Sequence, residues 1–380
     1  MGAKNSTQNK IENSQLFNES TISQNEEIVT KNSFEYLTVI GSGGFGKVWK
    51  VFQKKYKKIY AMKEMSKLSI IEQKSEKNVK NERELLTRIN HPFIINMFFS
   101  FQDKENLYLS TEFLEGKDLR YYIIKKIKFT ENQVKFLIAC LILSLEYLHS
   151  NYIIHRDIKP ENIIFDSKGY LKLTDFGIAI IQEPNLKDSS GTPGYSAPEI
   201  IYGQNQTIVS DYFSLGILCY EFMKGVRPYN GKSREEIKEK IMSKQIQIKK
   251  FDICNNWSLD SADFINKCIQ RKPSLRLGYK GISELKKHKW FNGFNWRKLY
   301  NFQIQSPFIP NLNDNYDDKY FSFNETTDKK YIKVVNWEKI NLTFLDYYEF
   351  DREDVLKKGD HVFFVNIHEE MYNNNDENDI

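Results

Sequence analysis

The chain has 380 residues, of which 40% are hydrophobic and 28% are charged, and its formal net charge is +5. This length and apolar content suffice for a folded domain of substantial size with extensions. No run approaches the roughly eighteen apolar residues of a membrane span, and residues 1–30 lack an apolar signal core, so we expect neither feature.

Charge and cysteine usage narrow the expected partners and compartment. Residues 351–380 hold three basic and nine acidic residues, so the body of the chain is basic. Its lysines are scattered without aromatic interleaving, and we therefore expect no nucleic-acid partner. No C-x-x-C spacing occurs, which indicates free thiols in a reducing, cytoplasmic setting. The four cysteines are Cys140, Cys219, Cys254 and Cys268.

Residues 1–30 are polar and rich in Asn, Ser, Gln and Thr, which predicts a disordered tail. The start, Met-Gly-Ala-Lys-Asn-Ser, matches the N-myristoylation pattern, with Gly2 as the acylated residue and Ser6 in the required place. A single myristoyl chain binds membranes only marginally and reversibly. We therefore expect weak, switchable membrane association; the oligomeric state is left open.

From Phe34 the pattern becomes strand-like, and a glycine-rich loop joins two strands, FEYLTVI and VWKVF. Such glycines let the backbone approach phosphates and offer its N–H groups. In a dinucleotide-binding fold a helix would follow directly, whereas here a second strand follows and favours a hairpin. The candidate phosphate-binding residues are Gly41, Ser42, Gly43, Gly44, Phe45, Gly46 and Val48.

The next strand, IYAMKEM, carries Ala61 and Lys63 and leads into a charged, helix-like stretch from 71 to 89. Within it, Glu82 is the expected ion-pair partner of Lys63. Glu84 is the alternative, although it fits an exposed helix face better. Leu86 lies one turn after Glu82 on the same face, which suits a core contact.

Further strands and helices follow along the chain. LYLSTEFLEG reads as a strand that runs into a connecting segment. Residues 131–150 have apolar side chains at helical spacing, with Thr130 as the N-cap. A second apolar helix is predicted near Asp211.

The stretch from Tyr152 to Gly177, YIIHRDIKPENIIFDSKGYLKLTDFG, places polar residues at the ends of short strand-like runs. Asp157 and Asp175 supply two carboxylates, Asn162 an amide and Lys159 a cation. Phosphoryl transfer needs such a set, because a base, a charge stabiliser and metal ligands must act together.

The pattern H-R-D-x-x-x-x-N followed by D-F-G, with G-x-G-x-x-G-x-V upstream, resembles eukaryotic protein kinases over roughly residues 34–323. Lys159 in K-P-E-N is similar to the serine/threonine-specific members. SFQDKENLYLSTEFLEGKDLRYYI resembles the AGC group, and within it the YANK-type kinases. The implied fold class is α+β, a two-lobed kinase fold with a small antiparallel-sheet lobe carrying one main helix, a larger mostly helical lobe and an AGC-like tail. The expected segments are a tail (1–30), a kinase domain (31–291; lobes 31–112 and 116–291), an AGC-like tail (292–350) and an acidic C-terminus (351–380).

The resemblance implies ATP and Mg²⁺ as cofactors and protein Ser/Thr hydroxyls as acceptors. It implies that Asp157 is the base, that Lys159 stabilises the transferred group, and that Asn162 and Asp175 bind magnesium. Lys63, held by Glu82, would contact the ATP phosphates. The remaining implied ATP-binding residues are Ala61, Thr111 as gatekeeper, Glu112 and Leu114 through their backbone, and Asp118 at the ribose.

The resemblance carries further expectations outside the ATP site. Asp118 and Glu161 imply a preference for arginine before the acceptor. Glu199 of Ala-Pro-Glu should pair with Arg276, and Asp211 should brace the catalytic loop. Asp188 stands where many relatives carry a phosphorylated threonine, so Arg156 could pair with it and support basal activity. Alternatively, Ser189 or Ser190 could be phosphorylated. Phe344-Leu345-Asp346-Tyr347 resembles a hydrophobic motif that folds back onto the small lobe. The rival interpretations are a pseudokinase that serves as a membrane-recruited binding module, and a kinase of lipids or small molecules.

Overall fold

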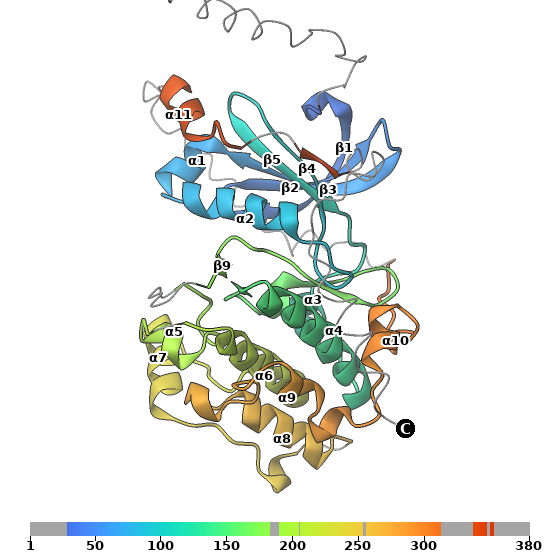
Figure 1. The fold of residues 1–380 in the computed structure, drawn as a ribbon, viewed down its shortest axis with the longest axis vertical. Coiled ribbons are helices and arrows are strands. Elements are labelled where there is room, and N and C mark those ends of the chain that lie inside the picture. Colours follow the sequence, from blue (N-terminus) through green and yellow to red (C-terminus); the bar gives the residue numbers. More distant parts are fainter. Residues whose placement is uncertain are drawn as a thin grey trace, which may run out of the picture.

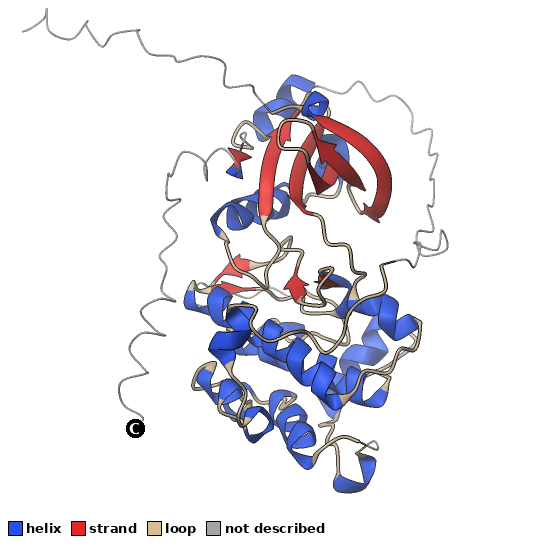
Figure 2. Ribbon diagram, turned by 90° about the vertical axis from the view of Figure 1, so that its right-hand side faces the viewer, coloured by secondary structure: helices blue, strands red, loops and turns tan. Residues whose placement is uncertain are grey.

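The computed structural model describes residues 29–182, 190–204, 206–253, 256–312, 337–347 and 350–352. Figure 1 shows two lobes stacked along the longest axis, and Figure 2 shows that the main strands gather in one lobe while helices make up most of the other. The predicted two-lobed α+β fold is therefore confirmed.

The small lobe is an antiparallel sheet in the order β1-β2-β3-β5-β4-β10. Its first two strands form the predicted glycine hairpin, with a turn at Gly44 and Phe45. β3 then runs beside β2 and pairs Lys63 with Val48 in register. Its strands within the domain are β1 (Phe34–Gly43), β2 (Gly46–Gln53), β3 (Lys58–Ser66), β4 (Met97–Gln102) and β5 (Asn106–Glu112).

The helix-like stretch predicted from 71 to 89 is two helices, α1 (Lys67–Glu72) and α2 (Glu76–Arg88). α1 ends where Lys74 adopts a left-handed φ of 53°. The Ser75 N–H then donates to the Ile70 carbonyl at 3.0 Å, and the Lys74 N–H donates to Ile71 at 3.0 Å. These two bonds form a Schellman end. The prediction of one continuous helix-like stretch was wrong. A Schellman end usually contains glycine, and the lysine at this position gives no sequence signal that a helix ends there.

The large lobe is built around two buried helices. α4 (Glu131–Ser150) begins at the predicted cap, where Thr130 Oγ1 accepts from the Gln133 N–H at 3.3 Å. Among the described residues α4 has the length and apolar character of a membrane span, but 78% of that segment is buried in the lobe. α6 (Val209–Lys224) packs beside it. The other helices are α3 (Leu119–Ile124), α5 (Pro198–Ile201), α7 (Arg234–Ser243), α8 (Leu259–Cys268), α9 (Ser283–Lys286) and α10 (Trp296–Tyr300).

Short strands carry the polar stretch between the lobes, as the sequence predicted. Two antiparallel pairs form, β6 with β9 and β7 with β8. The loops at the strand ends hold the candidate catalytic residues beneath the small lobe. The strands are β6 (Ile153–Ile154), β7 (Ile163–Phe165), β8 (Leu171–Leu173) and β9 (Ile180–Ile181).

The C-terminal segment folds back onto the small lobe, as predicted for the hydrophobic motif. It contributes α11 (Trp337–Thr343) and a sixth strand, β10 (Phe350–Asp351), which pairs with β4. Phe344 and Tyr347 are buried, with exposed fractions of 0% and 1%. Gln102 Nε2 donates to both of their carbonyls, at 2.9 and 2.8 Å. The tail therefore packs on the lobe that contains α2.

Candidate active site

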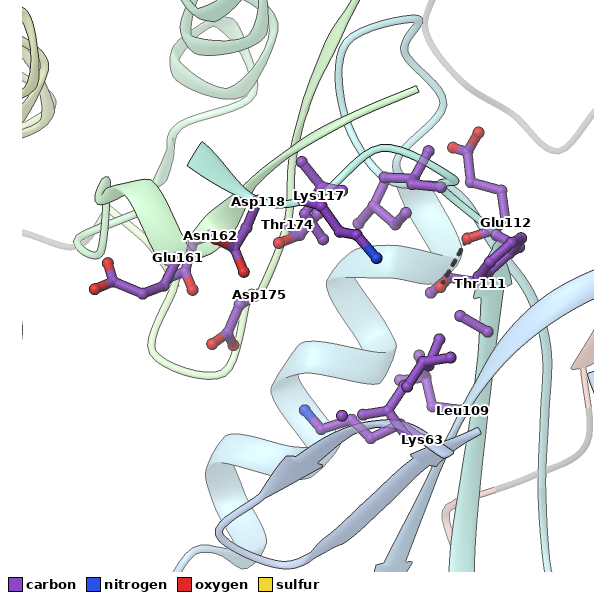
Figure 3. A pocket seen from close by; sticks show the side chains of 18 of the residues that line it. Lys63, Leu109, Thr111, Glu112, Lys117, Asp118, Glu161, Asn162, Thr174 and Asp175 are labelled. Atoms are coloured by element: carbon purple, nitrogen blue, oxygen red, sulfur yellow. Dashed lines mark hydrogen bonds between the residues drawn. The ribbon is translucent and has the colours of Figure 1, made fainter. Parts of the chain in front are cut away.

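A cavity of about 520 Å³ lies between the two lobes. Ile40, Gly41 and Val48 of the hairpin line one wall, and Asn162 and Asp175 line the opposite one. Figure 3 shows Lys63 facing this second wall from β3. The cavity is thus formed by residues from both lobes that are far apart in sequence.

Most of the predicted ATP-site residues line this cavity. The four residues at the hairpin tip do not, and they are Gly43, Gly44, Phe45 and Gly46. Gly46 is nevertheless needed for the hairpin, because a Cβ there would lie 1.9 Å from the Glu64 carbonyl oxygen of β3. The predicted residues that do line the cavity are Gly41, Ser42, Val48, Ala61, Lys63, Glu82, Thr111, Glu112, Leu114, Asp118, Asn162 and Asp175.

Sequence reasoning missed much of the apolar lining. Leu109 lies two residues before Thr111 on β5, so strand alternation could have found it. Ile40 and Thr174 directly precede Gly41 and Asp175. Other lining residues carry no local signal, because they reach the cavity only through packing; these are Ile95, Phe113, Gly116, Lys117, Tyr121 and Ile164.

Lys63 and Glu82 form an ion pair, with Nζ 2.8 Å from Oε2 and 3.1 Å from Oε1. Burial opposes the charged form of Lys63, but the carboxylates of Glu82 and Asp175 outweigh it and hold the pKa above its usual value. The alternative partner, Glu84, instead contacts Arg88 on the exposed face of α2. The structure therefore joins β3 to α2 through Lys63 and Glu82.

Asp175 has the character of an ionised ligand. Burial would raise its pKa, but Lys63 and the Gly177 N–H hold the pKa below the usual value. Its backbone has a left-handed φ of 63°, which is uncommon for a residue with a side chain. Carboxylate and amide oxygens are the donors that Mg²⁺ prefers, and Asp175 and Asn162 supply one of each beside the cavity. The residues present therefore fit a magnesium-bound phosphate group.

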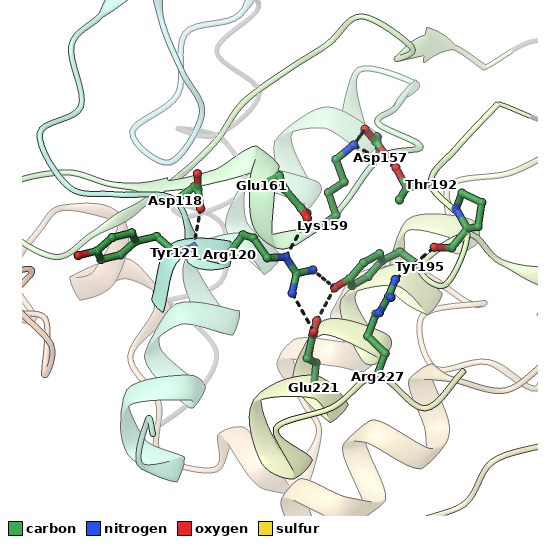
Figure 4. A network of polar contacts seen from close by, with 11 residues as sticks. Asp118, Arg120, Tyr121, Asp157, Lys159, Glu161, Thr192, Tyr195, Glu221 and Arg227 are labelled. Carbon is green, nitrogen blue, oxygen red and sulfur yellow. Dashed lines mark hydrogen bonds and ion pairs between the residues drawn. The ribbon is translucent and has the colours of Figure 1, made fainter. Parts of the chain in front are cut away.

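The Asp157 carboxylate is held from three sides. Lys159 Nζ lies 2.6 Å from Oδ2, and the Asn162 amide donates to the same oxygen at 2.9 Å. Thr192 Oγ1 donates to Oδ1 at 2.6 Å and accepts from Lys159 Nζ at 3.0 Å. Figure 4 shows this group beside the Thr192–Tyr195 turn. A hydroxyl group thus already sits where Asp157 could accept a proton.

Asp211 braces the loop that carries Asp157, as predicted. Its carboxylate accepts from the backbone N–H groups of His155 and Arg156 at 3.0 and 2.9 Å. Burial opposes its charge, but the hydrogen bond from His149 helps to lower its pKa below the usual value. Arg156 has a left-handed φ of 68°, so these bonds hold a strained backbone in place.

The predicted pair of Glu199 and Arg276 is also present. Arg276 Nη1 and Nη2 lie 2.6 and 2.9 Å from the two carboxylate oxygens. Neither side chain is more than 4% exposed. The pair ties the segment around α5 to the segment that precedes α9.

Asp118 caps α3, with Oδ1 accepting from the Tyr121 N–H at 2.8 Å. Burial raises its pKa to about 6. The Glu112 carboxylate accepts from Lys172 Nζ at 2.8 Å and from the Asn96 side-chain amide. The Glu112 backbone carbonyl accepts a hydrogen bond from Thr111 Oγ1 at 3.3 Å.

Two predicted sites lie outside the described residues. They are the acylation site Gly2 and the loop residue Asp188. Within the described part of the chain, Arg156 Nε donates to the Ile178 carbonyl at 2.5 Å. The pairing of Arg156 with Asp188 stays a prediction.

The protein kinase domain family matches residues 34–291, and the chain belongs to this family. A probable serine/threonine-protein kinase of Dictyostelium discoideum is 39% identical over 74% of this chain and 61% of its own length. Serine/threonine-protein kinase sgk-1 of Caenorhabditis elegans is 38% identical over 76% and 62%. Ribosomal protein S6 kinase alpha-3 of Homo sapiens is 36% identical over 79% and 41%. The chain thus spans about three fifths or less of the length of these relatives.

Proposed function

We propose that this protein is a serine/threonine protein kinase, which transfers the γ-phosphoryl group of ATP to protein hydroxyl groups. The observation that carries the proposal is the Asp157 carboxylate, bound to Lys159 and to the Thr192 hydroxyl beside a cavity of about 520 Å³. Relatives of the chain are named serine/threonine-protein kinases, which supports serine and threonine hydroxyls as the acceptors.

The proposed roles follow from charge and position. Asp157 orients the acceptor hydroxyl and accepts its proton, and Lys159 stabilises the charge that develops on the transferred group. Lys63, steadied by Glu82, holds the α- and β-phosphates under the hairpin that starts at Gly41. Thr111 lies beside the adenine, which hydrogen-bonds to backbone groups of the connecting segment.

Asn162 and Asp175 would hold magnesium ions. When bound, the metal neutralises the phosphate charges. The ion needs only a few protein ligands, because Mg²⁺ usually keeps several bound waters and is also coordinated by phosphate oxygens. The lowered pKa of Asp175 keeps that carboxylate ionised at neutral pH.

Three finer proposals accompany this function. The protein is AGC-like, and we propose that it is closest in kind to the YANK-type kinases. N-myristoylation at Gly2 would give weak, reversible membrane association of an otherwise cytoplasmic protein. Protein substrates would carry a basic residue before the acceptor, selected by the carboxylate of Asp118 or that of Glu161.

The test is transfer of ³²P from ATP to an arrayed library of serine and threonine peptides, alongside lipid and small-molecule acceptors. We expect transfer to peptides, lost in Asp175→Ala. Asp260→Ala is the matched control, because it removes an exposed carboxylate on α8. If neither transfer nor ATP binding is detected for the wild type, the kinase proposal is wrong and the binding-module interpretation takes its place.

A further inference from the structure

A second charged cluster lies next to Asp157, on the face that carries Thr192. It consists of Arg120 of α3, Glu161 of the catalytic loop, Glu221 of α6 and Tyr195 (Figure 4). Tyr195 follows Thr192 in one tight turn, because its N–H donates to the Thr192 carbonyl at 3.1 Å. The cluster is therefore one turn of backbone away from the acceptor site proposed above.

Two carboxylates in this position would form a site for a cation. Glu221 is 5% exposed and Glu161 is 45% exposed, so the pair runs from the interior of the lobe to its surface. Burying an unpaired carboxylate is costly, and a buried carboxylate strongly favours a basic partner. Without such a partner, the pair would draw in an arginine or lysine side chain of a bound peptide.

The chain supplies that partner itself. Arg120 Nε lies 2.8 Å from Glu161 Oε1, and Nη1 lies 3.0 Å from Glu221 Oε1. Nη2 donates to the Tyr195 hydroxyl at 2.6 Å, and that hydroxyl donates in turn to Glu221. All three guanidinium nitrogens are thus bound, and only 19% of the Arg120 side chain is exposed.

A second cation reinforces this balance. The Arg227 guanidinium lies 5.6 Å from the centre of the Tyr195 ring, and its Nη1 donates to the Pro193 carbonyl at 3.5 Å. The positive charges of two arginines therefore balance the negative charges of two glutamates around Tyr195. A further basic side chain would gain little from this part of the surface and would meet two like charges.

We propose that Arg120 is a specificity-determining residue, which fills the Glu161–Glu221 pair in place of a substrate's basic side chain. This inference rests on the proposed protein kinase activity and narrows its substrate class. Selection of a basic residue then depends on Asp118, whose carboxylate lies on the other side of Arg120 at the start of α3. The preferred substrates carry one basic residue before the acceptor, and a second one adjacent to it brings no advantage.

The test scans arginine through every position around the acceptor of a neutral serine peptide. The ratio kcat/KM is measured for wild type and for Arg120→Ala. We expect Arg120→Ala to gain a preference of about tenfold for arginine at one new position, since a charged hydrogen-bonded pair becomes available. The gain should appear as a lower KM for the arginine peptide than for the arginine-free peptide measured with the same variant. The double variant Arg120→Ala/Glu221→Gln should lose the gain.

Arg88→Ala is the matched control, because Arg88 is an exposed arginine of α2 that pairs only with Glu84 among the described residues. Arg120→Gln is the second variant, which removes the charge but keeps a polar side chain if Arg120→Ala does not fold. If neither variant gains a new arginine position, or if the wild type already gains tenfold from arginine at two adjacent positions, the inference is wrong.

Peptide binding measured by fluorescence anisotropy separates this inference from the proposed activity. Tighter binding of the arginine peptide to the Arg120 variants supports the filled cluster even if no phosphate is transferred. In that case the kinase proposal fails and the inference about the cluster stands. If phosphate is transferred but the Arg120 variants show no change in peptide preference, the kinase proposal stands and the inference about the cluster is wrong.

Discussion

Two ion pairs, one in the cleft and one inside the large lobe, are similar in length and different in setting. Lys63 and Glu82 are 2.8 Å apart, and Glu199 and Arg276 are 2.6 Å apart. The Lys63 side chain is 29% exposed and faces a cavity, whereas the Arg276 side chain is 0% exposed. Distance alone therefore does not reveal what each pair contributes.

The hydrogen bonds around each pair explain the difference. Arg276 also donates to the carbonyls of Val209 and Gln270, and Ser210 donates to Glu199. Every polar group of the inner pair is thus satisfied by the fold itself. Lys63 has its carboxylate partner and, beyond it, the open cavity and Asp175. We infer that the inner pair stabilises the lobe, and that the cleft pair is kept for a ligand.

The largest effect should come from breaking the inner pair. Arg276→Ala leaves Glu199 buried without its cation, which should lower the free energy of unfolding by about 3–5 kcal/mol. Urea denaturation followed by circular dichroism measures this loss. Lys267→Ala, which breaks an exposed pair with Asp263, is the control and should cost less than about 1 kcal/mol. Equal losses in the two variants would contradict the comparison.

Breaking the cleft pair should affect phosphate transfer more than stability. Lys63→Ala removes one positive charge at the phosphates, so kcat/KM for peptide phosphorylation should fall about 10²–10³-fold. The midpoint of urea unfolding should change less than in Arg276→Ala, because the carboxylate left behind, Glu82, lines the cavity, whereas Glu199 is enclosed in the lobe. Lys104→Ala, an exposed lysine between β4 and β5, is the control. A stable variant with unchanged transfer would remove Lys63 from the proposed site.

The tail sharpens the comparison, because Asp346 pairs with Lys80 of α2 at 2.7 Å and α2 also carries Glu82 of the cleft pair. Phe344→Ala removes a fully buried ring and should weaken the docking of the tail by about 3 kcal/mol. Faster hydrogen exchange in 337–347, with a smaller fall in kcat/KM than in Lys63→Ala, is the expected result. Leu345→Ala is the matched neighbour, since Leu345 is 70% exposed, and it should change neither quantity.

The smallest effect concerns pH and the carboxylate of Asp118. Its raised pKa of about 6 means that the group loses its charge as the pH falls through 6. The proposed preference for a basic residue should therefore be present at pH 7.5 and decline toward pH 5.5, which peptide kcat/KM ratios would measure. In Asp118→Asn the ratio should be low and independent of pH. A steady ratio in the wild type would exclude Asp118 as the selecting group.

Local sequence was enough to predict the hairpin and α4 with its Thr130 cap. These features depend on glycine, capping residues and apolar spacing, which act between near neighbours in the chain. The fold class and the roles of the polar residues around Asp157 were predicted from the resemblance to protein kinases. The return of Phe344 and Tyr347 to the small lobe was also predicted, from the resemblance of this segment to a hydrophobic motif of the AGC tail.

Other features arise only when distant segments pack together. The segment between α1 and α2 contains no glycine or proline that would have predicted the break. The apolar residues that line the cavity come from several separate elements. Arg120 and Glu221 are 101 residues apart, and nothing near either one indicates that they meet. The sequence by itself determined which chemical groups the protein carries. The tertiary structure decided which of their charges are already paired, because pairing depends on distances that only the folded chain sets.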